Sequence, residues 1–175
     1  MWIDVKVPYE PGKKLAFAYN RALSETTAPW VLLLDHDISL VNPQWYEVCL
    51  QVIERLKDTR VGLITCVTSG KTRAFQQSSF TNTDRMEYHI KKALQVYEQY
   101  GNQVIKVNTT ITGFFMLVKR AVWEQVKFKD MGHGVNKVDI DFSSRVLRAG
   151  YSIYVMKGLY VYHRRQFKDV SIDER

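Results

Sequence analysis

The sequence predicts an α/β fold in which a mainly parallel sheet is flanked by helices. Segments of strand character alternate with segments of helical periodicity along most of the 175 residues, which is the pattern of α/β proteins. The run Trp30 to Leu34 is apolar at every position, as expected of a strand that is buried on both faces of a parallel sheet. The segment Lys13 to Leu23 repeats its apolar residues at helical spacing, which predicts an amphipathic helix packed on that sheet.

The remaining elements follow in order, with limits set by turn and capping residues. Asn42 is placed to cap a helix whose first position is Pro43, and Gly101 and Gly150 are placed to end two later helices. Strands are predicted at Val5 to Pro8, Trp30 to Leu34, Val61 to Val67, Val104 to Val107, Phe114 to Val118, Ser152 to Met156 and Tyr160 to His163. Helices are predicted at Lys13 to Leu23, Pro43 to about Leu56, Asp84 to Tyr100, Arg120 to about Val126 and Asp139 to Arg148. The polar stretch Thr68 to Thr83 is the longest irregular one, which predicts a functional or a mobile loop.

Composition limits the class of protein. The chain is 46% hydrophobic and 25% charged, as in soluble globular domains, and no apolar stretch approaches the ~20 residues of a transmembrane helix. The first residues lack the basic and then apolar pattern of a signal peptide. Cys49 and Cys66 form no metal or redox motif and are predicted to be reduced thiols of the core. We therefore expect a cytoplasmic protein, and peripheral attachment to a membrane surface is left open.

The net charge of +7 favours an anionic partner such as a nucleotide, a nucleic acid or a membrane surface. The positive charges are scattered along the chain, and no zinc finger, helix-turn-helix or RNA-binding aromatic motif is found. The charge alone does not choose among these partners, and the lack of such a motif argues against nucleic acid, which stays a third alternative.

The most informative motif follows the strand Trp30 to Leu34, where Asp35 and Asp37 lie one residue apart. Ligands of open α/β sheets bind beyond the carboxyl ends of strands, and alternate residues of an extended chain point to the same side. Both carboxylates are therefore placed to bind one hard divalent cation, which would neutralise a phosphate. His36 between them is expected to point away and to pack against the protein. The alternative is a solvated strand end without a ligand.

Four blocks of residues, in the same order and spacing, resemble GT-A glycosyltransferases of the family 2 type. The blocks are Ala18 to Leu23 with Ala28 to Asp37, Thr112 to Trp123, Val138 to Phe142 with Arg145 and Arg148 to Tyr151, and Val161 to His163. The resemblance implies a GT-A fold, a Mn²⁺ or Mg²⁺ ion, and a nucleotide-diphosphate sugar, first of all a UDP-sugar, as donor. It also implies transfer with inversion to a hydroxyl of an unknown glycan, protein or lipid acceptor.

The resemblance further implies how the donor and the metal are bound. Asp35 and Asp37 would bind the ion and the donor, and His163 would be a further metal ligand. Gly113 would let the backbone approach the donor sugar, and Lys14 would contact its phosphates. The plainer alternatives are a structural histidine, a glycine that permits a bend, and a solvated lysine.

Asp139 is the expected catalytic residue, because the resemblance makes it the general base that takes the proton of the acceptor hydroxyl. A carboxylate at the start of a helix is also typical of an N-cap, and the two roles are compatible. Asp141 lies one helical turn before Arg145, which predicts a structural ion pair.

Residues 1–165 are expected to form a single GT-A-like domain, with a polar tail at 166–175. The family's usual N-terminal portion, which helps to bind the nucleotide base, is represented here only in part. Val138 also replaces the acidic residue that usually precedes the catalytic aspartate. A catalytically reduced module that binds a nucleotide or a sugar is therefore an alternative function.

A phosphatase of the haloacid dehalogenase type also begins with an apolar strand and two aspartates. Asp35 would then be the nucleophile and Asp37 the acid and base. This class needs a later acidic pair at the end of another apolar strand, whereas Asp139 and Asp141 open a predicted helix. It is therefore ranked below the glycosyltransferase.

Overall fold

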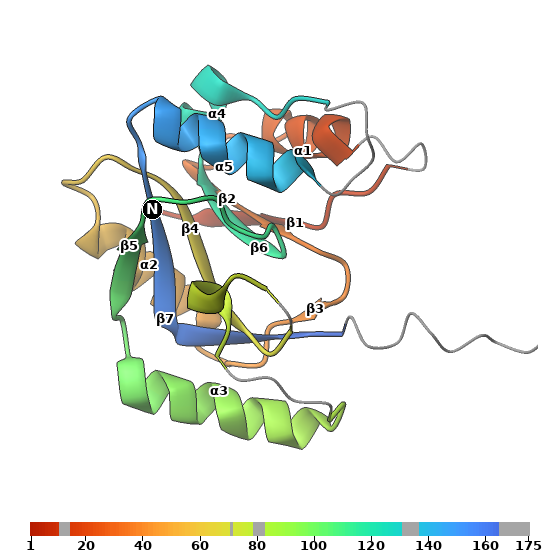
Figure 1. Cartoon of the computed structure of the whole chain (residues 1–175), viewed down its shortest axis with the longest axis vertical. Coiled ribbons are helices and arrows are strands. Elements are labelled where there is room, and N and C mark those ends of the chain that lie inside the picture. Colours follow the sequence, from red (N-terminus) through yellow and green to blue (C-terminus); the bar gives the residue numbers. More distant parts are fainter. Residues whose placement is uncertain (11–14, 71, 79–82, 131–136, 165–175) are drawn as a thin grey trace, which may run out of the picture.

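The computed structural model describes residues 1–10, 15–70, 72–78, 83–130 and 137–164. Within these residues, seven strands form one sheet in the order β1-β2-β6-β4-β7-β3, and β5 pairs with β7 outside this order (Figure 1). The strands are β1 (Ile3–Lys6), β2 (Trp30–Leu34), β3 (Ile38–Ser39), β4 (Val61–Thr68), β5 (Val104–Val107), β6 (Phe115–Lys119) and β7 (Ser152–His163). The helices are α1 (Leu15–Ser24), α2 (Trp45–Arg55), α3 (Met86–Tyr100), α4 (Arg120–Val126) and α5 (Val138–Arg148), with the short 3-10 helix η1 (Ala74–Gln76).

The sheet is mixed. β1 and β2 pair in parallel, as do β4 and β7, whereas β6 lies antiparallel between β2 and β4. The strands β1, β2, β4 and β7 therefore share one direction, and β3 and β5 run against β7. The predicted α/β fold, a mixed and mainly parallel sheet flanked by helices, is confirmed.

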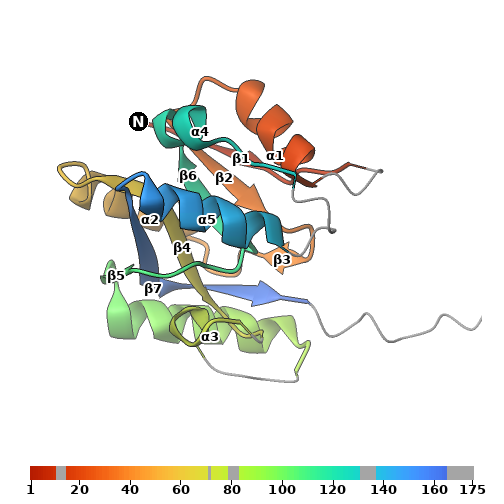
Figure 2. The ribbon, with the colours of Figure 1, turned by 45° about the horizontal axis from the view of Figure 1, so that its top comes forward.

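Helices cover both faces of the sheet. On one face, α2 packs Val48, Val52 and Ile53 against strand residues that include Leu32. On the other face, α1, α4 and α5 pack on a second core around Leu33. Figures 1 and 2 show these three helices grouped together, with α3 at the opposite end beside β7. The carboxyl end of β2 lies between these layers of helices, and Asp35 directly follows it.

Both cysteines are buried free thiols, as predicted. They belong to the core under α2, and burial raises the pKa of the Cys49 thiol to about 12. Burial also raises the pKa of Cys66, and the nearby Cys49 raises it further. Neither thiol is therefore ionised at neutral pH.

Several predicted strand limits differ from those of the structure, and in two cases the pairing between strands explains the difference. β1 begins at Ile3 instead of Val5, since Ile3 pairs with Trp30. The two strands predicted after Ser152 are one strand, β7, because β4 pairs with both halves of it across a register shift. The shift passes Gly158, where a Cβ atom would collide with the carbonyl oxygen of Gly101.

The helix start predicted at Pro43 was also wrong, because α2 begins at Trp45. The side-chain oxygen of Asn42 accepts the N–H of Gln44 at 2.9 Å, and its carbonyl accepts the N–H of Trp45. Asn42 thus closes a turn in front of the helix instead of capping it. Among the described residues, none of the helices combines the length and the apolar character that crossing a bilayer requires.

Candidate functional site

Asp35, Asp37 and His163 lie together at the carboxyl ends of β2 and β7. β3 pairs antiparallel with the end of β7, with Ile38 opposite His163, and this pairing brings the histidine to the two aspartates. The Nε2 atom of His163 is 3.2 Å from Oδ1 of Asp37. One ligand atom from each of the three residues can be chosen so that all three atoms lie within 4.8 Å of one another. His163 is buried and both aspartates are half-buried.

The position of the aspartates follows from a tight turn after β2. The carbonyl of Asp35 accepts the N–H of Ile38 at 3.2 Å, which closes a four-residue turn, and Asp is favoured at the first position of such turns. The carbonyl of Asp37 accepts the N–H of Arg164 at 3.0 Å, which fixes the turn to the end of β7. His36, inside the turn, is exposed, so the expectation that its side chain packs against the protein was wrong.

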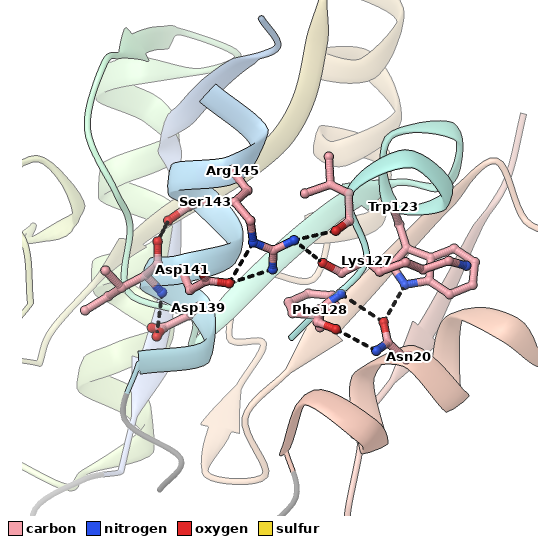
Figure 3. Close-up of polar contacts among 10 residues, drawn as sticks. Asn20, Trp123, Lys127, Phe128, Asp139, Asp141, Ser143 and Arg145 are labelled. Carbon is pink, nitrogen blue, oxygen red and sulfur yellow. Dashed lines mark hydrogen bonds and ion pairs between the residues drawn. The ribbon is translucent and has the colours of Figure 1, made fainter. Parts of the chain in front are cut away.

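Asp139 lies in the first turn of α5, and both of its carboxylate oxygens accept backbone hydrogen bonds. Oδ2 accepts the N–H of Gly113 at 2.6 Å. Oδ1 accepts the N–H of Ile140 at 2.8 Å, the bond drawn at Asp139 in Figure 3. The helix N-cap is Lys137, so the alternative role of Asp139 as N-cap is wrong. The two N–H donors fix the orientation of the carboxylate.

Gly113 is buried against Asp139. A Cβ atom on Gly113 would lie 2.6 Å from the Cβ atom of Asp139, well inside van der Waals contact. Position 113 therefore needs a glycine because Asp139 approaches so closely that a side chain would not fit. Its expected contact with a donor sugar stays a prediction.

The metal-ligating candidates and Asp139 meet at Gly113 and Phe114, the two residues immediately before β6. Asp35 donates its N–H to the carbonyl of Phe114 at 3.1 Å, and Asp139 is bonded to the neighbouring Gly113. The rings of Phe114 and His163 have centroids 5.8 Å apart. Because neighbouring Cα atoms are ~3.8 Å apart, one short piece of backbone holds the main chain of Asp35 and the carboxylate of Asp139.

Burial raises the pKa of the phenol of Tyr19, and the negative charges of both carboxylates, Asp35 and Asp139, raise it further. Tyr19 therefore stays protonated and provides a neutral wall next to the two acids. Its ring packs on Phe128 with centroids 4.8 Å apart.

The predicted ion pair of Asp141 and Arg145 is present on α5. Arg145 Nη2 is 2.6 Å from Asp141 Oδ2, and Arg145 Nη1 donates to the carbonyl of Lys127 at 2.7 Å and to that of Val126 (Figure 3). The pair thus anchors the segment after α4 to the helix that carries Asp139.

A family model described as "Glycosyltransferase like family" matches residues 5–175. The chain belongs to this glycosyltransferase-like family. The predicted resemblance to GT-A glycosyltransferases of the family 2 type is thereby confirmed. The comparison with curated proteins gave no match.

Among solved structures, the chain is similar to a UDP-glucose pyrophosphorylase from Acinetobacter baumanii. The TM-score is 0.45 and the sequence identity is 10%, over 89% of this chain and 50% of that structure. The glycosyltransferase-like chain thus spans half of the length of this similar structure.

Two side-chain amides of this glycosyltransferase-like chain were not identified as site residues from the sequence. Asn20 of α1 accepts the N–H of Phe128 and the indole N–H of Trp123, each at 2.9 Å, and donates to the carbonyl of Phe128 at 2.8 Å (Figure 3). Asn20 is a polar residue beside the apolar stripe of a predicted helix, and this position could have indicated it from the sequence.

Gln76 is the second amide. The sequence around it has no helical or strand periodicity, so nothing in the pattern could have indicated it. Lys14 lies outside the described residues.

Proposed function

We propose that this chain is a metal-dependent glycosyltransferase that moves a sugar from a nucleotide-diphosphate donor, with a UDP-sugar as first choice, to an acceptor hydroxyl with inversion. Membership of the glycosyltransferase-like family supports the reaction class. The observation that carries the mechanism is the cluster of Asp35, Asp37 and His163 beside a carboxylate, Asp139, that is held by backbone N–H groups.

The donor set fits a divalent ion. Two carboxylates and one imidazole nitrogen within 4.8 Å combine the oxygen ligands that Mg²⁺ and Mn²⁺ accept with a nitrogen ligand that favours Mn²⁺ over Mg²⁺. Asp35, Asp37 and His163 would hold the ion. When bound, such an ion supplies Lewis-acid stabilisation of the negative charge that develops on the departing diphosphate.

The chain's own residues would carry the proton transfer and the alignment. The acceptor oxygen attacks the anomeric carbon while Asp139 takes the hydroxyl proton, and the bond from that carbon to the diphosphate oxygen breaks with its electron pair leaving on the diphosphate. The two backbone bonds of Asp139 fix the direction of its carboxylate before the acceptor arrives. One base opposite the leaving group implies inversion at the anomeric carbon.

Calorimetric titration tests donor binding. UDP is titrated into the protein in the presence of Mn²⁺ at about 1 mM, a concentration well above micromolar affinities, and again in the presence of a chelator. We expect binding only with the ion, and its loss in Asp37→Asn. The matched control is Asp58→Asn, which changes an exposed carboxylate in the turn after α2. UDP binding that ignores the metal, or that survives in Asp37→Asn, would overturn the proposed metal site.

Release of UDP from a panel of UDP-sugars, with and without mixed glycoside acceptors, tests transfer. We expect Asp139→Asn to lower kcat by about 10²–10⁴-fold, the usual contribution of a positioned general base. The Kd for UDP with Mn²⁺ is expected to change less than about twofold, which is well under the tenfold change that corresponds to about 1.4 kcal/mol. Retained turnover in Asp139→Asn would assign the base elsewhere. Metal-dependent UDP binding without transfer from any donor would instead favour the reduced binding module.

A further inference from the structure

We propose that Gln76 is a positioning residue for Asp139 and acts through the peptide unit that joins Thr112 to Gly113. The proposal rests on the proposed role of Asp139 as the general base. Gln76 ends η1, far along the chain from both residues, and its side chain is buried completely.

The amide of Gln76 binds one backbone residue at both of its polar groups. Its Nε2 donates to the carbonyl of Thr112 at 3.0 Å, and its Oε1 accepts the N–H of Thr112 at 2.9 Å. A third bond runs from Nε2 to Oγ1 of Thr65 on β4, at 2.9 Å. The threonine bond anchors the amide to the sheet, so the pair of bonds to Thr112 acts like the pairing of a neighbouring strand.

The carbonyl of Thr112 and the N–H of Gly113 belong to the same peptide unit. That unit is planar and trans, so the two groups point in opposite directions. Gln76 binds the carbonyl on one side, and Asp139 binds the N–H on the other, at 2.6 Å. Rotation of the unit would break both bonds together, so the bond to Gln76 determines where the N–H donor of Asp139 points.

The preceding residues also bond alternately to the segment around η1 and to α5. Thr110 is bonded through Oγ1 to Arg73, just before η1, at 3.0 Å. Ile111 donates its N–H in the other direction, to Ser143 of α5, at 3.3 Å. Residues 110–113 therefore form a short strap between the η1 turn and α5, and Gln76 is the buried side chain that binds this strap at Thr112, next to Gly113.

Gln76→Met tests the proposal, because methionine keeps the length and the volume of the side chain but makes none of the three bonds. In a ¹⁵N–¹H spectrum, the Gly113 amide of the wild type is expected far downfield, since a short hydrogen bond to a carboxylate deshields the proton. We expect Gln76→Met to move this resonance upfield in the same direction as Asp139→Asn. Gln77→Met is the matched control, and we expect it to leave the resonance in place.

Kinetics separate positioning from general loss of structure. We expect kcat of Gln76→Met to fall about 10-fold, at the low end for residues that orient a functional group, while KM for the donor and the Mn²⁺ affinity change less than about twofold, which is the signature of an interaction made in the transition state. An unmoved Gly113 resonance with unchanged kcat would overturn the proposal. If the wild type transfers no sugar, the base role of Asp139 fails, and the resonance alone decides whether Gln76 orients the Gly113 amide.

A second variant keeps the test decisive if Gln76→Met does not fold. Thr65→Val removes only the third bond of the Gln76 amide and preserves the shape of a strand residue. We expect a smaller displacement of the Gly113 resonance in the same direction. No displacement in Thr65→Val, in a folded protein, would contradict the anchoring of Gln76 through β4.

Discussion

Replacing Gly113 by alanine is expected to damage stability and transfer together, because the new methyl group would meet a part of Asp139 that cannot rotate away. The added Cβ atom at position 113 would lie 2.6 Å from the Cβ atom of Asp139, whereas ordinary contacts begin near 3.4 Å. The shortfall is the difference between these two distances, about 0.8 Å. A Cβ atom is fixed to its backbone, so the first turn of α5 or residues 110–113 must shift by about this distance.

The size of both effects follows from that shift. Overpacking of a buried site costs about 1–3 kcal/mol, which lowers the thermal midpoint of a domain of this size by roughly 3–10 °C. Misplacement of a reacting group by about 1 Å lowers turnover by about 100-fold. The free energy of unfolding is measured by urea denaturation, and kcat is measured with the donor identified in the transfer assay.

Gly70→Ala is the matched control. Its new Cβ atom would lie 3.8 Å from the Cβ atom of His163, an ordinary van der Waals distance, so we expect a change within about 0.5 kcal/mol. The reasoning would be refuted if Gly113→Ala were as stable and as active as Gly70→Ala.

Three further predictions follow from the metal cluster, the buried thiols and the α5 ion pair. Mn²⁺ at about a hundredfold excess over its Kd is expected to stabilise the wild type by about 2.7 kcal/mol in calorimetric melting, and His163→Gln is expected to abolish this gain; an equal gain in both would exclude His163 as a ligand. Burial raises the pKa of Cys49 from 9.0 to about 12, so the thiol of the unfolded chain loses its proton at a lower pH than the thiol of the folded chain. The protonated thiol therefore contributes fully to the free energy of unfolding below pH 9, and this contribution is lost as the pH rises toward 12, by about 1.4 kcal/mol per pH unit. Urea midpoints between about pH 8 and pH 10.5, a window that spans the ordinary thiol pKa, should therefore fall less steeply in Cys49→Ala, and equal slopes would contradict this account. Arg145→Lys loses the forked contacts to Asp141 and to two carbonyls, so we expect about 1–3 kcal/mol of destabilisation in urea, against little change for the exposed Arg148→Lys.

Local patterns were enough to predict the elements with clear limits. The strand Trp30–Leu34 was predicted to the residue, because a proline precedes the apolar run and a carboxylate follows it. The strand Val104–Val107 and the helix Arg120–Val126 were predicted equally well. The joined strand β7 could not be predicted, because its continuity depends on β4, which lies far away in the sequence and pairs with both halves.

Some residues of the candidate site could likewise be predicted from local sequence, and others could not. Asp35 and Asp37 could be placed at a strand end from the sequence, since their side-chain spacing is local. The proximity of His163 was implied only by resemblance, and the structure accounts for it through the pairing of β3 with β7. Gln76 was beyond sequence reasoning, because its partner Thr112 is 36 positions away and a buried amide in a polar loop resembles a solvated one.

The meeting of Asp35, Asp139 and His163 around Gly113 and Phe114 has a consequence for how the protein acquires its site. These groups come from the early, middle and late parts of the polypeptide, and β6, which follows Phe114, is flanked by β2 and β4. Contacts of such long sequence separation form slowly and depend on one another. Ion affinity should therefore emerge only with the final cooperative folding step, so that recovery of Mn²⁺ binding after dilution from urea reports completion of the whole sheet.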